Sequence, residues 1–281
     1  MPHETLAGSA TARANIALAK YWGKSDVDCN LPAVPSISLT LDELVTETRV
    51  VFDPSLRDDR LELDGKVASA AQSRRVCELL DRVRARAGFR HRAEVTSTNH
   101  FPTAAGLASS ASGFSALAGA ACRAAQLQVE PSTLSAIARK SSASAARSVF
   151  GGFVELESGK PGDDSLCATP VAPKTHWDVR MVLALTATGP KSVGSTEAME
   201  RSRLTSPYYD AWVAAAPGWA RAIKKAIAAR DLESLGEAME QSTLAFHCCA
   251  ITSQPSTLYW GPGTMAALQA VRALRDRGVP V

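Results

Sequence analysis

The stretch that decides the fold is residues 102–111, which read Pro102-Thr103-Ala104-Ala105-Gly106-Leu107-Ala108-Ser109-Ser110-Ala111. It joins a predicted strand at 92–98 to a predicted helix of small residues that runs to about Gln126. Small side chains let backbone N–H groups approach an anion closely, and the start of a helix adds unpaired donors and partial positive charge. Serine hydroxyls can bind phosphate oxygen or Mg²⁺. The stretch therefore suits the phosphates of a nucleoside triphosphate.

The common phosphate-binding motifs do not describe this loop. No Gly-Lys-Ser or Gly-Lys-Thr follows it, which excludes a Walker A loop, and the GxGxxG spacing of dinucleotide-binding proteins is missing. A structural role fits the composition equally well, because Ala and Gly also let a helix pack closely on a sheet. Composition alone leaves both interpretations open.

The residues before the loop predict a sheet and one long helix. Alternating apolar side chains predict a strand at 44–52, and the turn Asp64-Gly65 within 60–67 predicts a partner hairpin. Residues 70–87 carry apolar side chains at helical spacing, and Gly88 follows them as a typical C-terminal cap.

The residues after the loop change from mixed to helical structure near 180–190. We therefore predict an N-terminal lobe at 1–185 and a C-terminal lobe at 186–281. The elements predicted after the loop are a helix from Pro131 to about Lys140, strands at 152–157 and 178–187, and helices at 207–229, 231–246 and 264–277.

Composition excludes several classes of protein. The 281 residues are 46% hydrophobic and 21% charged, which is ordinary globular usage and excludes disorder as the main state. A formal net charge of +3 without charge blocks gives no indication of nucleic-acid binding. Six cysteines without CxxC spacing, and an N-terminus unlike a signal peptide, favour the cytoplasm. The uncharged stretch 101–122 is too rich in Ala, Ser and Gly for a membrane span.

The motif Pro-x-x-x-Gly-Leu-x-Ser-Ser-Ala at 102–111 resembles the phosphate loop of the GHMP small-molecule kinases. Two longer segments, 15–24 and 99–114, resemble mevalonate diphosphate decarboxylases, and the resemblance continues through 139–152, 191–199 and 246–247. It implies an α/β (α+β) fold of two lobes, a mixed N-terminal lobe (ribosomal protein S5 domain 2-like) and a helix-rich, ferredoxin-like C-terminal lobe.

The resemblance also implies an activity. Mevalonate 5-diphosphate would be converted to isopentenyl diphosphate, with ATP phosphorylating the 3-hydroxyl and ADP, phosphate and CO₂ released. ATP and Mg²⁺ would be required, a homodimer would be the assembly, and neither nucleic acid nor a membrane would be a partner.

The same resemblance implies the residues of the site. Lys20, Ser110 and Arg147 would be catalytic: Lys20 near the reacting hydroxyl, Ser110 at Mg²⁺ and the γ-phosphate, and Arg147 on the substrate carboxylate. A guanidinium suits two coplanar oxygens better than an ammonium. ATP would be bound by Asn99, Pro102, Ala105, Gly106, Leu107, Ala108, Ser109 and Ser110. Substrate would be bound by Tyr21, Trp22, Lys24, Ser142, Ser144, Arg147, Ser195 and Thr196.

Simpler interpretations stay open for some of these residues. Ser110 could cap a helix, Arg147 could be a surface arginine, and Trp22 fits a core aromatic as well as a substrate contact. A metal site at His247-Cys248-Cys249 is not expected, because three adjacent ligands cannot surround one tetrahedral ion.

One feature of the family pattern is missing. The family carries a late strand with Asp-Ala-Gly-Pro, whose Asp lies near the 3-hydroxyl, and this sequence ends at Val281 without it. We therefore expect a chain shortened at the C-terminus, which could be a catalytically impaired nucleotide-binding remnant. The sequence is also compatible with a phosphomevalonate decarboxylase or a mevalonate 3-kinase of the same fold.

Overall fold

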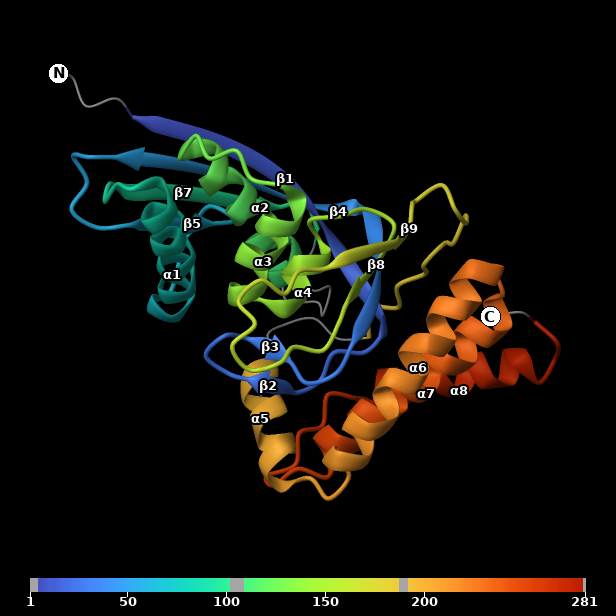
Figure 1. Cartoon of the computed structure of the whole chain (residues 1–281). Coiled ribbons are helices and arrows are strands. Elements are labelled where there is room, and N and C mark those ends of the chain that lie inside the picture. The colour runs from blue at the N-terminus through green and yellow to red at the C-terminus, as the bar shows by residue number, and fades with distance from the viewer. Residues whose placement is uncertain (1–4, 102–108, 187–191, 280–281) are drawn as a thin grey trace.

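The computed structural model describes residues 5–101, 109–186 and 192–279. Its main element is a mixed sheet in the order β6-β5-β7-β4-β8-β9, with β1 paired to β4 off this path (Figure 1). The two longest strands, β1 and β4, pair antiparallel, and β4 is central because it also pairs with β7 and β8. A separate pair, β2 and β3, follows β1. The strands are β1 (Leu6–Ala19), β2 (Lys24–Asp26), β3 (Leu31–Pro32), β4 (Ser36–Asp53), β5 (Arg60–Leu63), β6 (Lys66–Val67), β7 (Arg92–Asn99), β8 (Phe153–Leu156) and β9 (Thr169–Ala172).

Four helices lie on one face of the first part of the sheet. They are α1 (Ala70–Ala87), α2 (Ser109–Ala124), α3 (Pro131–Ser141) and α4 (Ala143–Arg147). Fully buried side chains such as Val50, Phe52 and Leu79 form the core between sheet and helices. Helix α2 is built of small residues, so its backbone packs directly against β1 and β4.

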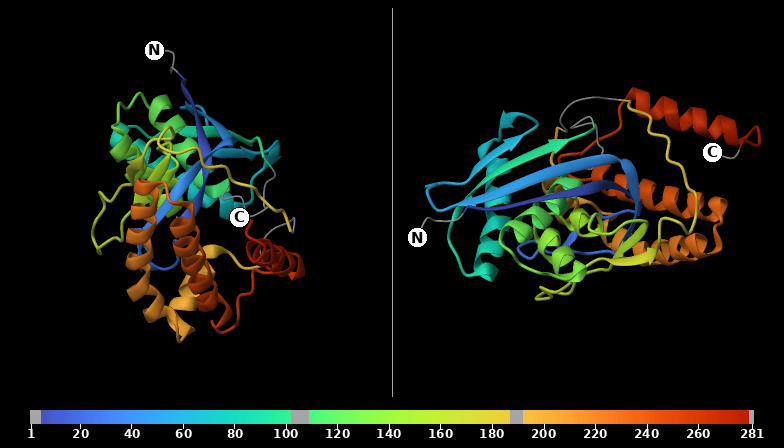
Figure 2. Two further views of the ribbon diagram at one scale, coloured as in Figure 1. Left: turned by 90° about the vertical axis from the view of Figure 1, so that its right-hand side faces the viewer. Right: turned by 90° about the horizontal axis from the view of Figure 1, so that it is seen from above.

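The remaining helices follow in the second half of the chain. They are α5 (Ser195–Thr205), α6 (Tyr209–Ala229), α7 (Leu232–Ile251) and α8 (Pro262–Arg275). Helices α6 and α7 run side by side, and α8 is a separate rod with no buried residue (Figure 2). Apolar residues of α6 and α7 share a core with the end of β1 and the start of β4, including Leu18, Ile37 and Ile223.

Several predicted elements are confirmed. Helix α1 has the predicted bounds, begins with a capping box between Ser69 and Gln72, and ends at Gly88 with φ of 76°. The hairpin β5–β6 turns at Asp64 and Gly65, both with positive φ, although its partner strand is β7 rather than β4. The helices predicted at 207–229, 231–246 and 264–277 correspond to α6, α7 and α8.

One predicted element is wrong, and several elements were not predicted, including the short strands β2, β3 and β9. The described part of the expected strand, 178–186, forms no regular secondary structure. Val182 is 93% exposed, and within the described residues this segment pairs with no strand, so its apolar side chains gain nothing from sheet formation. Helices α4 and α5 are absent from the predictions.

Among the described residues, no helix has the length and apolar character needed to cross a membrane.

Candidate active site

The segment 20–24, which follows β1, carries four of the predicted site residues, Lys20, Tyr21, Trp22 and Lys24. Lys20 follows the buried end of the strand, and its backbone N–H donates to Oγ of Ser242 at 3.0 Å. Its ammonium Nζ donates to the carbonyl oxygen of Ala17 at 2.8 Å. Burial, with a smaller effect of the nearby positive charge of Arg147, lowers the pKa of Lys20 to about 8. The site thus holds an amine whose charge is sensitive to pH near 8.

Arg147 is a deeply buried cation near this segment. It ends α4, and its side chain is 1% exposed, so the surface interpretation is wrong. Its Nε donates to Oγ of Ser38 at 3.0 Å, and its Nη1 donates to Oγ of Ser36 at 2.6 Å. No carboxylate of the described residues forms an ion pair with it. Burial lowers its pKa to about 10, so at neutral pH it remains a cation.

Tyr21 and Trp22 pack against apolar side chains, and Tyr21 also lies near the positive charge of Arg147. The Tyr21 hydroxyl is buried without a hydrogen-bond partner among the described residues, and burial raises the pKa of this phenol. Trp22 is 4% exposed and packs against Phe246 with ring centroids 5.1 Å apart. Its burial fits the core interpretation, but its Nε1 is buried without a hydrogen-bond partner among the described residues, so the substrate-contact interpretation stays open as well. Lys24 begins β2 and is partly exposed, and burial lowers its pKa.

The serines predicted to bind substrate lie in two places. Ser142 and Ser144 flank the start of α4, the short helix that ends at Arg147, and their hydroxyl oxygens are 3.1 Å apart. Ser195 and Thr196 are exposed in the first turn of α5. No hydrogen bond among the described residues joins either of these two to Lys20 or Arg147.

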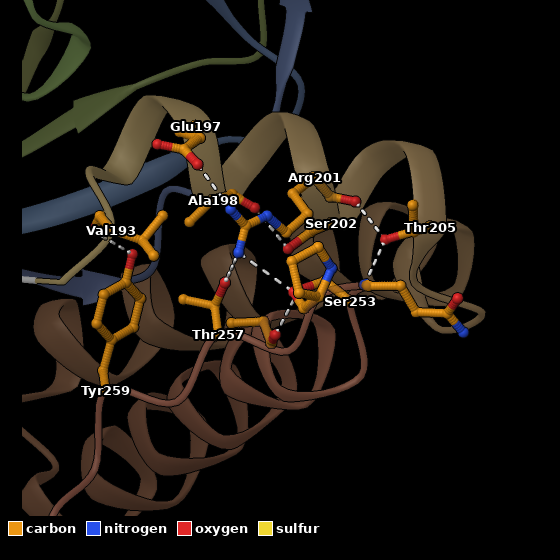
Figure 3. Close-up of polar contacts among 12 residues, drawn as sticks. Val193, Glu197, Ala198, Arg201, Ser202, Thr205, Ser253, Thr257 and Tyr259 are labelled. Atoms are coloured by element: carbon orange, nitrogen blue, oxygen red, sulfur yellow. Dashed lines mark hydrogen bonds and ion pairs between the residues drawn. The ribbon is translucent and has the colours of Figure 1, made fainter.

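Helix α5 is held by the loop after α7. Arg201 donates through Nη1 to the carbonyl oxygen of Pro255 at 3.2 Å and to Oγ1 of Thr257 at 3.3 Å. The Tyr259 hydroxyl donates to the carbonyl oxygen of Val193 at 3.2 Å, just before the helix (Figure 3). These contacts fix the place from which Ser195 and Thr196 are presented.

A pocket of about 770 Å³ opens between α1, α2 and the strands β5–β7. This volume lies within the ordinary range for small-molecule sites. Asn99, Ser109 and Ser110, all predicted to bind ATP, line it. Asn99 is fixed by Thr46, whose hydroxyl donates to Oδ1 at 2.6 Å. Pro102, Ala105, Gly106, Leu107 and Ala108 lie outside the described residues.

The pocket also contains residues that the sequence did not single out. Arg75 lies over the ring of Phe114 at 4.5 Å and donates to the carbonyl oxygen of Ser141 at 2.6 Å. An aromatic ring held by a guanidinium beside apolar Leu61 and Leu63 is a suitable wall for a nucleobase. These residues come from different elements, so only the folded chain reveals that they meet.

The residues present fit a magnesium ion bound with nucleotide. Within 5–101, 109–186 and 192–279 no three His, Cys, Asp or Glu residues are grouped closely enough to hold a metal ion. Mg²⁺ at nucleotide sites takes many of its ligands from phosphate and water, so it does not need such a cage. The exposed hydroxyl of Ser110 on the pocket wall is a suitable protein ligand.

Solved structures share this architecture over nearly the whole chain. A complex of MDDEF with MVAPP, AMPPCP and magnesium superposes with a TM-score of 0.90 and 38% identity, covering 99% of this chain and 85% of that one. Mevalonate diphosphate decarboxylase from Staphylococcus aureus gives 0.89 and 35%, covering 98% and 83%. The fold is therefore that of the GHMP kinase superfamily of ATP-dependent enzymes.

Comparison of sequences narrows the class. The diphosphomevalonate decarboxylase-like N-terminal domain matches residues 12–167, and the mevalonate 5-diphosphate decarboxylase C-terminal domain matches residues 181–277. Diphosphomevalonate decarboxylase of Candida albicans is 37% identical over 287 aligned positions, covering 96% of this chain and 79% of the relative. The chain belongs to the diphosphomevalonate decarboxylase family.

Proposed function

We propose that this chain catalyses the ATP-dependent decarboxylation of mevalonate 5-diphosphate to isopentenyl diphosphate, ADP, phosphate and CO₂. The observation that carries the proposal is Arg147, a buried cation with no carboxylate ion-pair partner among the described residues. Burying a charge is costly unless something compensates it. A substrate carboxylate supplies that compensation, and its two coplanar oxygens match the guanidinium.

The chemistry requires two kinds of electrostatic help. The tertiary 3-hydroxyl becomes a good leaving group only after phosphorylation, and loss of that phosphate leaves positive character at C3. The C–CO₂ bond then breaks and its electron pair forms the alkene. Arg147, with Ser142 and Ser144 beside it, holds the carboxylate anionic and correctly directed. Lys20 lies at the reacting hydroxyl and adds positive charge near the transferring phosphoryl group.

Different residues bind the two substrates in this proposal. ATP binds in the pocket lined by Asn99, Ser109 and Ser110. Mg²⁺ on Ser110 and the phosphates would neutralise negative charge during phosphoryl transfer. Tyr21 and Lys24 hold the diphosphate of the second substrate, Ser195 and Thr196 contribute hydroxyl donors, and Trp22 supports the segment from the core.

The assembly and location are further parts of the proposal. We infer a homodimer that acts in the cytoplasm, and a division of the chain into lobes at 1–185 and 186–281. The family resemblance supports the homodimer and the two lobes. The six cysteines, all free thiols, support a reducing compartment such as the cytoplasm. Sedimentation equilibrium at micromolar concentration tests the dimer, and a mass of one chain would contradict it.

The decisive experiment follows ADP and CO₂ together. The purified chain is incubated with ATP, Mg²⁺ and mevalonate 5-diphosphate carrying a labelled carboxyl carbon, and we expect both products in equal amounts. ADP without CO₂ would point to a 3-kinase, and a preference for mevalonate 5-phosphate would point to the monophosphate enzyme. Binding of both ligands without turnover would identify a nucleotide-binding remnant.

A further inference from the structure

The segment 20–24 is held by side chains from distant parts of the chain. Its backbone makes hydrogen bonds to two side chains of the helices α6 and α7. The N–H of Lys20 donates to Oγ of Ser242 in α7 at 3.0 Å, and the carbonyl oxygen of Trp22 accepts from Nε1 of Trp212 in α6 at 2.9 Å. Trp212 is 2% exposed and Ser242 is 1% exposed, so both side chains are buried; the Trp212 bond is buried and the Ser242 bond is partly buried.

The first turn of α6 also contacts this segment through Tyr209. A methyl group built on Gly23 would overlap the Tyr209 hydroxyl, so the tyrosine lies directly against the glycine backbone. Gly23 has φ of +101°, which side chains other than hydrogen rarely permit. The backbone between Trp22 and Lys24 is therefore confined on one side by α6.

These contacts bear on function because of what the segment carries. In the proposed function Lys20 acts at the reacting hydroxyl, and Tyr21 and Lys24 hold the diphosphate. A displacement of about 1 Å can lower a rate about 100-fold when reacting groups must be aligned. Side chains that fix the backbone on both sides of Tyr21 therefore control how these groups meet the substrate.

We propose that Trp212 and Ser242 are positioning residues that hold the segment 20–24 in its substrate-binding conformation. They act through the backbone of Trp22 and Lys20 and contact neither substrate. The inference deepens the proposed function and rests on it. The nucleotide pocket supplies an internal control, because its walls come from β4–β7, α1 and α2 and include no residue of this segment or of α6 and α7.

The test compares two tryptophans of one helix. Trp212→Phe keeps an aromatic ring and removes the donor to Trp22, whereas Trp219→Phe removes an equally long bond, 2.9 Å, from Trp219 Nε1 to Gln241 in α7. We expect Trp212→Phe to raise the KM for mevalonate 5-diphosphate about 10-fold, the effect of a lost hydrogen bond of about 1.4 kcal/mol, and to leave the KM for ATP within twofold. Trp219→Phe should change neither.

Ser242→Ala provides a second measurement if Trp212→Phe does not fold. It removes the acceptor for Lys20 and should raise the KM for mevalonate 5-diphosphate several-fold, again with the KM for ATP unchanged. Equal rises in both KM values, or a rise no larger than that of Trp219→Phe, would overturn the inference. Wild-type turnover tests the proposed function separately, because an inactive wild type rejects that function before any variant is compared. Calorimetric titration with each ligand checks that the KM changes reflect binding.

Discussion

Nη1 of Arg147 donates a 2.6 Å hydrogen bond to Oγ of Ser36, and this hydroxyl belongs to the start of the central strand β4. Nε of Arg147 is held in the same way by Ser38, two residues further along the strand. Neutral hydroxyls orient the guanidinium without neutralising it. The central strand therefore fixes the orientation of a full positive charge.

Arg147→Gln should distinguish the role of this charge in catalysis from its role in stability. We expect kcat/KM to fall about 10²–10³-fold, as when a directed donor is lost from an active site. The free energy of unfolding should change by less than about 1 kcal/mol, because lost hydrogen bonds are offset by relief of a buried charge. Urea denaturation and steady-state assays measure the two effects. Arg180→Gln, a surface arginine paired with Asp178, is the control and should alter neither.

Lys20 should make stability depend on pH in a definite direction. Its pKa is about 8 in the folded chain and about 10.5 when unfolded. Between these values the unfolded chain binds more protons, so the contribution of Lys20 to the free energy of unfolding rises with pH by an amount on the order of 1–3 kcal/mol. Urea denaturation at pH 8 and pH 10 should show this rise in the wild type relative to Lys20→Met. Parallel curves for the two proteins would contradict it.

Gly113 offers a way to close the nucleotide pocket. It lies in α2 and lines the pocket, and a Cβ added there would meet no atom within 4 Å. Gly113→Ala should raise the free energy of unfolding by about 0.5–1 kcal/mol through helix propensity. Gly113→Leu should extend into the pocket and raise the KM for ATP about 10-fold or more, as expected for a clash of about 1–3 kcal/mol. An unchanged KM for ATP in the leucine variant would place the nucleotide elsewhere.

Asp59 should matter for stability but not for the reaction. Its side chain forms a buried ion pair with Arg84 and accepts from the backbone N–H of Ala93 at 2.8 Å. Within the part of the chain that the structure describes, Asp59→Asn leaves Arg84 with only the exposed Asp81 as an acidic partner, and it should lower the free energy of unfolding by about 3 kcal/mol. The exposed neighbour variant Asp58→Asn should have little effect. Both should keep wild-type kcat/KM below their melting temperatures.

Local signals predicted the parts of this fold that depend on neighbouring residues. Helix α1 was predicted from periodic apolar side chains that lie between the capping residues Ser69 and Gly88. Each cap interacts only with the nearest turn of the helix, so it can be recognised from local sequence. The strand prediction for 178–186 was wrong because a strand needs a partner strand, and the residues of the segment do not reveal whether one exists. Helix α5 was missed because it buries only Ala198, Met199 and Ser202, so its apolar pattern is weak.

For the candidate site, too, some residues could be predicted from the sequence and others could not. The resemblance pointed to Lys20 and Arg147, and the structure brings both into one buried region. It could not reveal that Arg75 lies over Phe114, or that Trp212 reaches Trp22 across 190 positions, because such pairs arise only when separate elements pack together. The roles assigned to the individual site residues stay predictions for the experiments above.

The shared core of β1, β4 and the helices α6 and α7 has a consequence for dissecting this protein. Leu18 and Ile37 are buried against Ile223, and Trp22 is buried against Trp212 and Tyr209. A fragment encoding only 1–185 would expose these side chains to water and release the backbone of Lys20 and Trp22. Such a fragment would aggregate or bind mevalonate 5-diphosphate poorly, so the catalytic apparatus cannot be expressed as an N-terminal piece and must be studied with both halves joined.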